Sequence, residues 1–207
     1  MSLEALITFI IASTLLTLAP GPDNIFVLTQ SALYGRRSGI LITLGLCTGL
    51  IVHTSSVALG VAAIFMVSVT AFTLLKLVGA AYLLFLAWSA FRASVNRIDD
   101  KEQELPDATT LYRRGIIMNL SNPKVAIFFL AFLPQFADPS AGNMTGQLFL
   151  LGLIFIIIAL VMFIAIACMA GIIADLLKTS ERAQLLLNRM AGLIFIGLAL
   201  RLATTSR

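Results

Sequence analysis

Long apolar runs, separated by short polar turns, account for nearly the whole chain. A run of about 20 apolar residues is long enough to cross the hydrocarbon core of a bilayer as a helix. The run 38–75 contains no formal charge and would be roughly 57 Å long as one helix, nearly twice that thickness. It must therefore fold back, and we expect the turn at Ser68-Val69-Thr70. The pattern predicts about six transmembrane helices, at residues 3–32, 39–66, 72–91, 115–136, 147–174 and 190–202.

Two of these predicted spans, the first and the fourth, contain helix-breaking residues. The first span carries Pro20-Gly21-Pro22 followed by Asp23 and Asn24, and the fourth carries residues 119–124, which end in Pro123 and Lys124. Proline removes a backbone donor and leaves carbonyl groups without helical partners. In lipid, such groups are tolerated only where protein or a water-filled cavity surrounds them. The two interruptions therefore require a local structural or functional reason.

Composition supports this assignment and excludes several function classes. Of 207 residues, 59% are hydrophobic and 12% are charged, with a mean hydropathy of +1.01. Soluble domains carry about 25% charged residues, so the chain is predicted to be an integral membrane protein. The net charge of +4 comes from Lys and Arg at the ends of apolar runs, so it indicates membrane topology and no nucleic-acid partner. Cys47 and Cys168 have no metal or redox spacing and are interpreted as small core residues.

The polar connections suggest both the topology and an internal repeat. Lys and Arg are concentrated in alternate connections, which predicts that these are cytoplasmic and that both termini face outward. The longest polar segment, 92–114, is expected to be a solvated, flexible loop, and 175–189 a partly helical connection. Two three-helix halves, about 1–95 and 114–207 and joined by a loop at about 93–113, would then be inverted repeats of one transporter domain. A five-span arrangement with a re-entrant segment remains an alternative.

The two interruptions align with each other at a constant offset of 101 residues. Pro22 and Asp23 then match Pro123 and Lys124, so an ionisable residue follows each proline. Interrupted segments at corresponding places in two halves are the best sequence-level indication of a transport site. The first N–H groups of a half-helix attract anions, and unwound carbonyls accept hydrogen bonds from an ammonium group. A zwitterionic amino acid needs both kinds of partner.

The residues of the two breaks therefore form the candidate site. Asp23 is the expected ammonium partner or proton carrier, and Lys124 is the expected carboxylate partner. The alternatives are that the two side chains pair with each other or merely anchor helix ends at the interface. The Asn side chains either bind substrate or cap the broken helices. The candidate substrate-binding residues are Pro20, Gly21, Pro22, Asp23, Asn24, Asn119, Asn122, Pro123 and Lys124.

His53 and the small-residue motif Gly45–Gly49 lie in the second predicted span. His53 is a candidate for proton coupling together with Asp23, because histidine titrates near neutrality. A neutral histidine that is hydrogen-bonded within the bundle is the alternative. Gly45 and Gly49 have GxxxG spacing and predict close packing of the second span against a neighbouring helix.

The ordered set of motifs resembles the LysE/RhtB amino-acid exporter family. The resemblance rests on Pro20-Gly21-Pro22, the basic turn at 34–39, residues 79–83 and Asn122-Pro123-Lys124, and it spans the whole chain in length and motif order. It implies a multi-pass protein of the bacterial inner membrane that exports neutral amino acids of the homoserine, threonine or leucine type, without a cofactor, by proton antiport. Its expected partners are the substrate, protons and lipid, and a homo-oligomer remains open.

Two other function classes were weighed against amino-acid export. An exporter of small ions or metals, or of other small amino-acid derivatives, would use the same architecture. A membrane-embedded enzyme or redox carrier would need a nucleophile constellation, a metal set or a dithiol. One histidine and two separated cysteines supply none of these convincingly, so no catalytic residue or metal ligand is expected.

Overall fold

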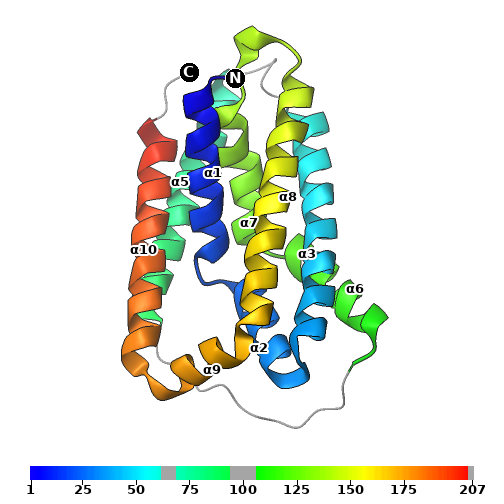
Figure 1. The fold of residues 1–207 in the computed structure, drawn as a ribbon. Helices are drawn as coiled ribbons and strands as arrows, with labels where there is room; N and C mark the ends of the chain where they lie inside the picture. The colour runs from blue at the N-terminus through cyan, green and yellow to red at the C-terminus, as the bar shows by residue number, and fades with distance from the viewer. Residues whose placement is uncertain (62–68, 94–105, 205–207) are drawn as a thin grey trace.

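The chain folds into a bundle of long helices in a computed structural model that describes residues 1–61, 69–93 and 106–204 (Figure 1). Every regular element in these ranges is helical, as the sequence predicts. The elements are α1 (Leu3–Leu18), α2 (Pro22–Tyr34), α3 (Arg36–Ser56), η1 (Val57–Val61), α5 (Val69–Arg92), α6 (Ala108–Leu120), α7 (Pro123–Ile127), η2 (Phe128–Phe132), η3 (Leu133–Phe136), η4 (Pro139–Ala141), α8 (Met144–Cys168), α9 (Ala170–Thr179) and α10 (Glu181–Thr204).

Four helices of the described chain are long and apolar enough to cross a membrane, and two bent pairs raise the number of spans to as many as six. The pairs are Leu3–Leu18 with Pro22–Tyr34, bent by 55°, and Ala108–Leu120 with Pro123–Phe136, bent by 50°. Both predicted breaks are therefore confirmed. Each second half begins with proline at its first helical position, where the missing N–H has no helical partner to lose.

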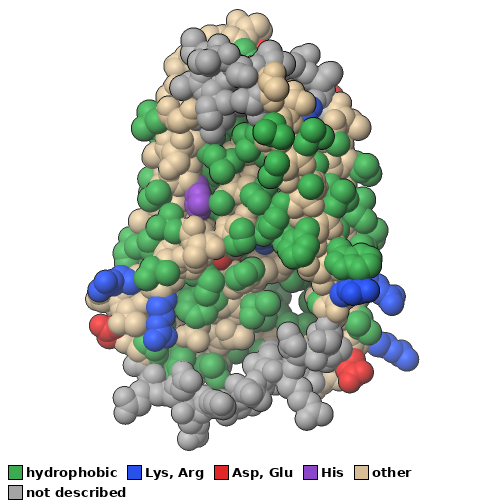
Figure 2. Space-filling model, turned by 180° about the vertical axis from the view of Figure 1, so that it is seen from behind, with side chains coloured by type: hydrophobic (Ala, Val, Ile, Leu, Met, Phe, Trp, Pro, Cys, Tyr) green, Lys and Arg blue, Asp and Glu red, His purple; other side chains and the backbone are tan. Residues whose placement is uncertain are grey.

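The two bent pairs run in opposite directions through the bundle. The first descends and the second ascends in the view of Figure 1, which is the relation that inverted repeats require. The N-terminus and the end of α10 lie at one end of the bundle, and the α2–α3 turn and the α9–α10 connection lie at the other. On the face shown in Figure 2, apolar side chains cover the middle and Lys and Arg gather towards this second end.

Helix boundaries differ from the sequence-based expectation in several places. The predicted loop 92–114 is too long, because Asp107 caps α6 through Thr110 N–H (2.9 Å) and residues 108–114 are helical; residues 94–105 lie outside the described chain. Of the predicted turn Ser68-Val69-Thr70, Ser68 is outside the description and Val69 begins α5.

The second half of the bundle also departs from the predicted boundaries. The fifth predicted span is not one helix, because α8 ends at Cys168 and α9 starts two residues later. The sixth helix begins at Glu181, well before the predicted start at residue 190. The interpretation of both cysteines as core residues is right for buried Cys47 and wrong for exposed Cys168.

A cluster of phenylalanine rings fills the core between the second break and the end of the bundle that holds the termini. Neighbouring centroids lie 4.9 to 6.4 Å apart, within the usual range for aromatic pairs. Much of this cluster comes from η2 and η3, which continue directly from α7. The members are Phe9, Phe128, Phe129, Phe132, Phe136 and Phe155.

Candidate functional site

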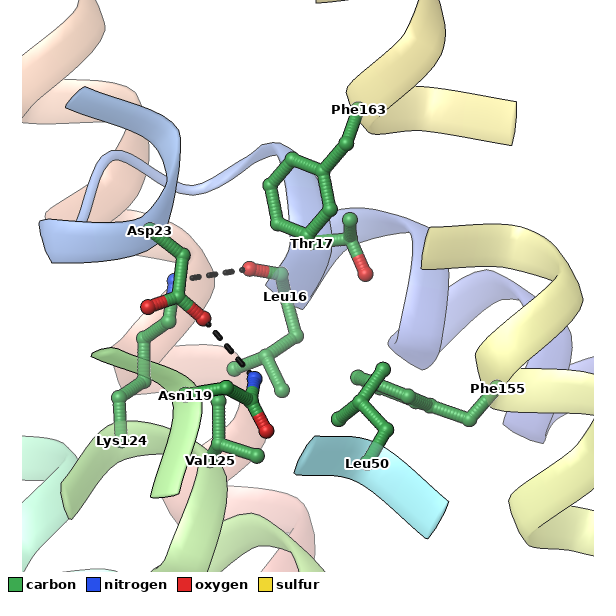
Figure 3. A pocket seen from close by; sticks show the side chains of 9 residues that line it. All are labelled: Leu16, Thr17, Asp23, Leu50, Asn119, Lys124, Val125, Phe155 and Phe163. Atoms are coloured by element: carbon green, nitrogen blue, oxygen red, sulfur yellow. Dashed lines mark hydrogen bonds between the residues drawn. The ribbon is translucent and has the colours of Figure 1, made fainter. Parts of the chain in front are cut away.

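The two helix breaks meet inside the bundle and place Asp23 and Lys124 in one cavity (Figure 3). Asp23 is 2% exposed and Lys124 is 6% exposed, whereas the prolines that precede them, Pro22 and Pro123, face outward. The alternative that these charges merely anchor helix ends at the interface is therefore wrong. The alignment at an offset of 101 residues predicted this meeting of an acid and a base.

Lys124 and Asp23 do not pair directly in this structure. These two described groups attract each other electrostatically, but their charged atoms do not come within 4.0 Å. Instead, Lys124 Nζ donates hydrogen bonds to Ala19 O (3.0 Å) and Leu16 O (3.3 Å), the carbonyls that α1 leaves unpaired where it ends. Unwound carbonyls at the first break thus do bind an ammonium group, and that group belongs to the protein itself.

Asp23 is bound by the other break. Asn119 Nδ2 donates a hydrogen bond to Asp23 Oδ2 at 3.1 Å. His53 lies one step further out, since its Nε2 is 3.3 Å from Asn119 O and its ring contacts Phe129. This contact matches the hydrogen-bonded alternative for His53, although it does not test a role in proton coupling.

The asparagines hold the broken backbone as well as facing the site. Asn24 Nδ2 donates to Thr17 O at 2.7 Å and so ties α2 to the end of α1. Asn122 Oδ1 accepts a hydrogen bond from Lys124 N at 3.0 Å and caps α7. Both helix-capping interactions were anticipated as alternatives to substrate binding, and each uses only part of the amide.

Several buried polar atoms at the breaks have no hydrogen-bond partner among the described residues. Three are acceptors, Asp23 Oδ1, Asn24 Oδ1 and Asn119 Oδ1, and one is a donor, Asn122 Nδ2. Buried polar groups are almost always paired, because leaving one unpaired costs about 1–3 kcal/mol. This concentration of unpaired groups within two short segments makes the breaks the candidate site for a polar molecule.

The other residues that line the cavity are mostly apolar, and the sequence did not predict them. Thr17 adds a hydroxyl group, and the aromatic rings come from α8, far away in sequence. Only the packing of the whole bundle brings these positions together, and nothing in the periodicity of α8 distinguishes them from other core residues. The lining residues that sequence reasoning missed are Leu16, Thr17, Leu50, Val125, Phe155 and Phe163.

The cavity has a volume of about 20 Å³. A single water molecule needs roughly 10–15 Å³ by the same measure, so the cavity has no room for an amino acid in this conformation. Gly21 contributes to this tight fit, because a Cβ there would lie 2.9 Å from Lys124 Nζ. Admission of any larger molecule requires the broken helices to move apart.

Comparison with known proteins decides the family. The family model described as LysE type translocator matches residues 14–206. The chain belongs to the LysE translocator family. This assignment confirms the resemblance drawn from the motifs and makes the chain a multi-pass membrane transporter, as opposed to an enzyme.

Individual relatives cover almost the whole chain. A homoserine/homoserine lactone efflux protein of Salmonella typhimurium is 34% identical over 197 residues, covering 95% of this chain and 94% of the relative. A leucine efflux protein of Enterobacter sp. is 30% identical over 199 residues, with the same coverage of each chain. An uncharacterized membrane protein of Vibrio cholerae is 28% identical over 204 residues, covering 99% and 98%. No solved structure matches the chain.

Proposed function

We propose that this protein exports neutral amino acids of the homoserine, threonine or leucine type from the bacterial cytoplasm across the inner membrane, by alternating access and proton antiport. The observation that supports this most is the set of unpaired polar atoms around Asp23 where the two broken helices meet. Membership of a translocator family and relatives named for homoserine and leucine efflux point in the same direction.

The chemistry of the site suits an α-ammonium group better than any other part of the substrate. Three of the four unpaired atoms are acceptors, and one of them belongs to a carboxylate. Homoserine and homoserine lactone share the amino group, but the lactone has no free carboxylate. A protein that exports both compounds must therefore recognise the amino end, and the same reasoning applied here assigns that end to Asp23.

The remaining groups are suited to the other parts of the substrate. Asn122 Nδ2 and the first N–H groups of α2 are donors for a carboxylate. Phe155, Phe163 and Leu50 offer an apolar wall to an uncharged side chain. Such a wall fits homoserine-like and leucine-like side chains better than charged ones, which supports the neutral branch of the family.

The arrangement of the bundle suggests how access alternates. The phenylalanine cluster closes the cavity towards the end that holds the termini, and the positive-inside pattern assigns that end to the outside. Repeat one at about 1–95 and repeat two at about 114–207 would then rock against each other around the central cavity. Asp23 and His53 remain candidates for proton coupling.

Export from cells tests this proposal. In a bacterium that lacks its own homoserine exporter, expression should raise the efflux rate of preloaded labelled L-homoserine several-fold and lower its intracellular level. Asp23→Asn should reduce efflux by about 10- to 100-fold, because a hydrogen bond to a charged group contributes about 1.5–3 kcal/mol. Glu4→Gln is the matched control, since it removes an exposed carboxylate from the first turn of α1.

Three results would contradict the proposal. Efflux of homoserine, threonine and leucine equal to that of cells with empty vector would remove amino-acid export as the function. If growth of the expressing cells depended on the concentration of a metal ion and not on that of an amino acid, the small-ion alternative would be favoured. Full activity of Asp23→Asn would place the substrate elsewhere in the protein.

A further inference from the structure

The Lys124 ammonium occupies the carbonyl site where a substrate ammonium group is expected to bind. Its Nζ uses two of its three donors on Leu16 O and Ala19 O, and Leu16 lines the cavity that also contains Asp23. The side chain is buried, and a Cβ on Gly21 would lie 2.9 Å from its Nζ, so a larger residue at this position would crowd the ammonium group. The protein thus holds its own amine on carbonyls beside Asp23, the group to which the proposed function assigns the amine of the substrate.

The charge balance around Lys124 is simple. Asp23 on α2 is the charged group that acts on Lys124, and His53 on α3 acts on Asp23 and contacts the carbonyl of Asn119. At this point α1 contributes backbone carbonyls alone. Where α5 meets the segment after the second break, Gly79 approaches Ile127 and Ala131, and the charged residues of α5 are Lys76 and Arg92, neither of which lines the cavity. One cation therefore balances one carboxylate across the cavity.

We propose that Lys124 couples transport to protons: its ammonium group occupies the Leu16–Ala19 carbonyl site in the substrate-free protein, and it yields this site to the substrate ammonium by releasing its proton. This inference rests on the proposed function and replaces Asp23 and His53 as the group that carries the proton. Asp23 then remains ionised and balances whichever ammonium group is present.

The cycle balances in protons. When the cavity opens to the cytoplasm, the Lys124 ammonium releases H⁺ to that side and the neutral amine leaves the carbonyls. The substrate ammonium takes its place, and the cavity then opens to the outside and releases the substrate. Lys124 takes up H⁺ from the outside and returns to the carbonyls, so one proton enters for each substrate molecule exported.

A purely structural role for Lys124 makes a different prediction. A cation at the C-terminal end of a helix stabilises it through the helix dipole, and Lys124 bound to the end of α1 fits that description as well. An arginine would serve this purpose equally, because it carries the same charge and more donors. Arginine stays protonated at any pH that proteins experience, so it cannot yield the carbonyl site by losing a proton.

Proton release on substrate binding tests the proposal directly. Purified protein in weakly buffered detergent solution, with a pH-sensitive dye, is titrated with L-homoserine and in parallel with leucine. The wild type should release about one proton per substrate bound, and its affinity should rise about tenfold per pH unit while Lys124 is protonated, since one proton is displaced. Arg113→Gln, which removes an exposed charge from α6, should behave in the same way.

Variants of Lys124 separate coupling from structure. Lys124→Gln should bind without releasing protons, with an affinity that no longer depends on pH. Lys124→Arg should lower the affinity at least tenfold and also release none, since its charge stays on the carbonyls. Lys124→Met, with a side chain of similar length, is a second neutral variant in case the amide disturbs folding, and thermal unfolding in detergent checks each protein.

The proposal is overturned if Lys124→Gln or Lys124→Met still releases a proton on binding. It is equally overturned if Lys124→Arg restores wild-type binding and transport, which would make Lys124 a structural cation. If wild-type protein binds neither homoserine nor leucine, the proposed function itself fails, and this outcome is distinct from failure of the coupling role alone.

Discussion

Gly21 allows the Lys124 ammonium to reach the end of α1. A Cβ at this position would lie 2.9 Å from Lys124 Nζ, closer than real Cβ contacts allow, and 3.3 Å from Cε, which is a tight contact. The backbone of Gly21 is extended, with φ −169° and ψ 178°, so any residue can adopt its conformation and only space requires glycine. The constraint therefore belongs to the site and not to the folding of the turn.

Gly21→Ala should therefore impair transport far more than stability. We expect homoserine efflux to fall about tenfold, because the ammonium is displaced from its carbonyls by a few tenths of an ångström or more. Thermal unfolding should shift little, since the long lysine side chain moves more easily than backbone. Gly197→Ala is the control, as a Cβ there meets nothing within 4 Å. Homoserine efflux at the wild-type rate in Gly21→Ala would contradict the claim that the ammonium group is tightly confined.

At the scale of helices, α3 and α6 cross at backbone distance through Gly45 and Gly115. A Cβ on Gly115 would lie 2.3 Å from Ile42 O, and one on Gly45 would lie 2.1 Å from Tyr112 O. Backbone atoms cannot move aside as a flexible side chain can. The crossing fixes α6, whose C-terminal end carries Asn119 and therefore the hydrogen bond to Asp23.

Gly115→Ala should separate these two helices and destabilise the protein. Overpacking of this kind costs about 1–3 kcal/mol, and the displacement of Asn119 should also reduce transport. Thermal unfolding in detergent measures the first effect, and efflux from cells measures the second. Gly171→Ala, at a position with open space around it, is the matched control. Unchanged stability of Gly115→Ala would show that the crossing is looser than the structure has it.

The same helices show how far sequence reasoning reaches. Each break and the charge that follows it lie in consecutive residues, at Pro22-Asp23 and at Pro123-Lys124. The sequence could therefore predict the two bends and the meeting of the two charged residues. The GxxxG spacing of Gly45 and Gly49 likewise indicated close packing, but it did not identify α6 as the partner. A local sequence motif indicates that an element is bent or closely packed. The identity of the elements that it packs against depends on the whole fold.

The binding partner of Lys124 and the apolar wall of the cavity were beyond such reasoning. Ala19 O and Leu16 O are backbone atoms with no signature of their own, and Phe155 and Phe163 look like ordinary apolar residues of α8. Helix ends were also misplaced where polar residues continue a helix, as at Glu181 in α10. Charged residues mark the limit of the membrane more reliably than the limit of a helix.

At the scale of the whole molecule, the central claim is that the protein binds an amino acid in the cavity between two broken helices. It then exports this amino acid in exchange for protons. Purified protein in vesicles preloaded with labelled L-homoserine tests this most directly. Acidifying the outside should accelerate homoserine efflux well beyond its rate without a pH gradient, a protonophore should abolish this acceleration, and Asp23→Asn vesicles should show none. Efflux that is indifferent to the pH gradient and to the identity of the solute would contradict the account.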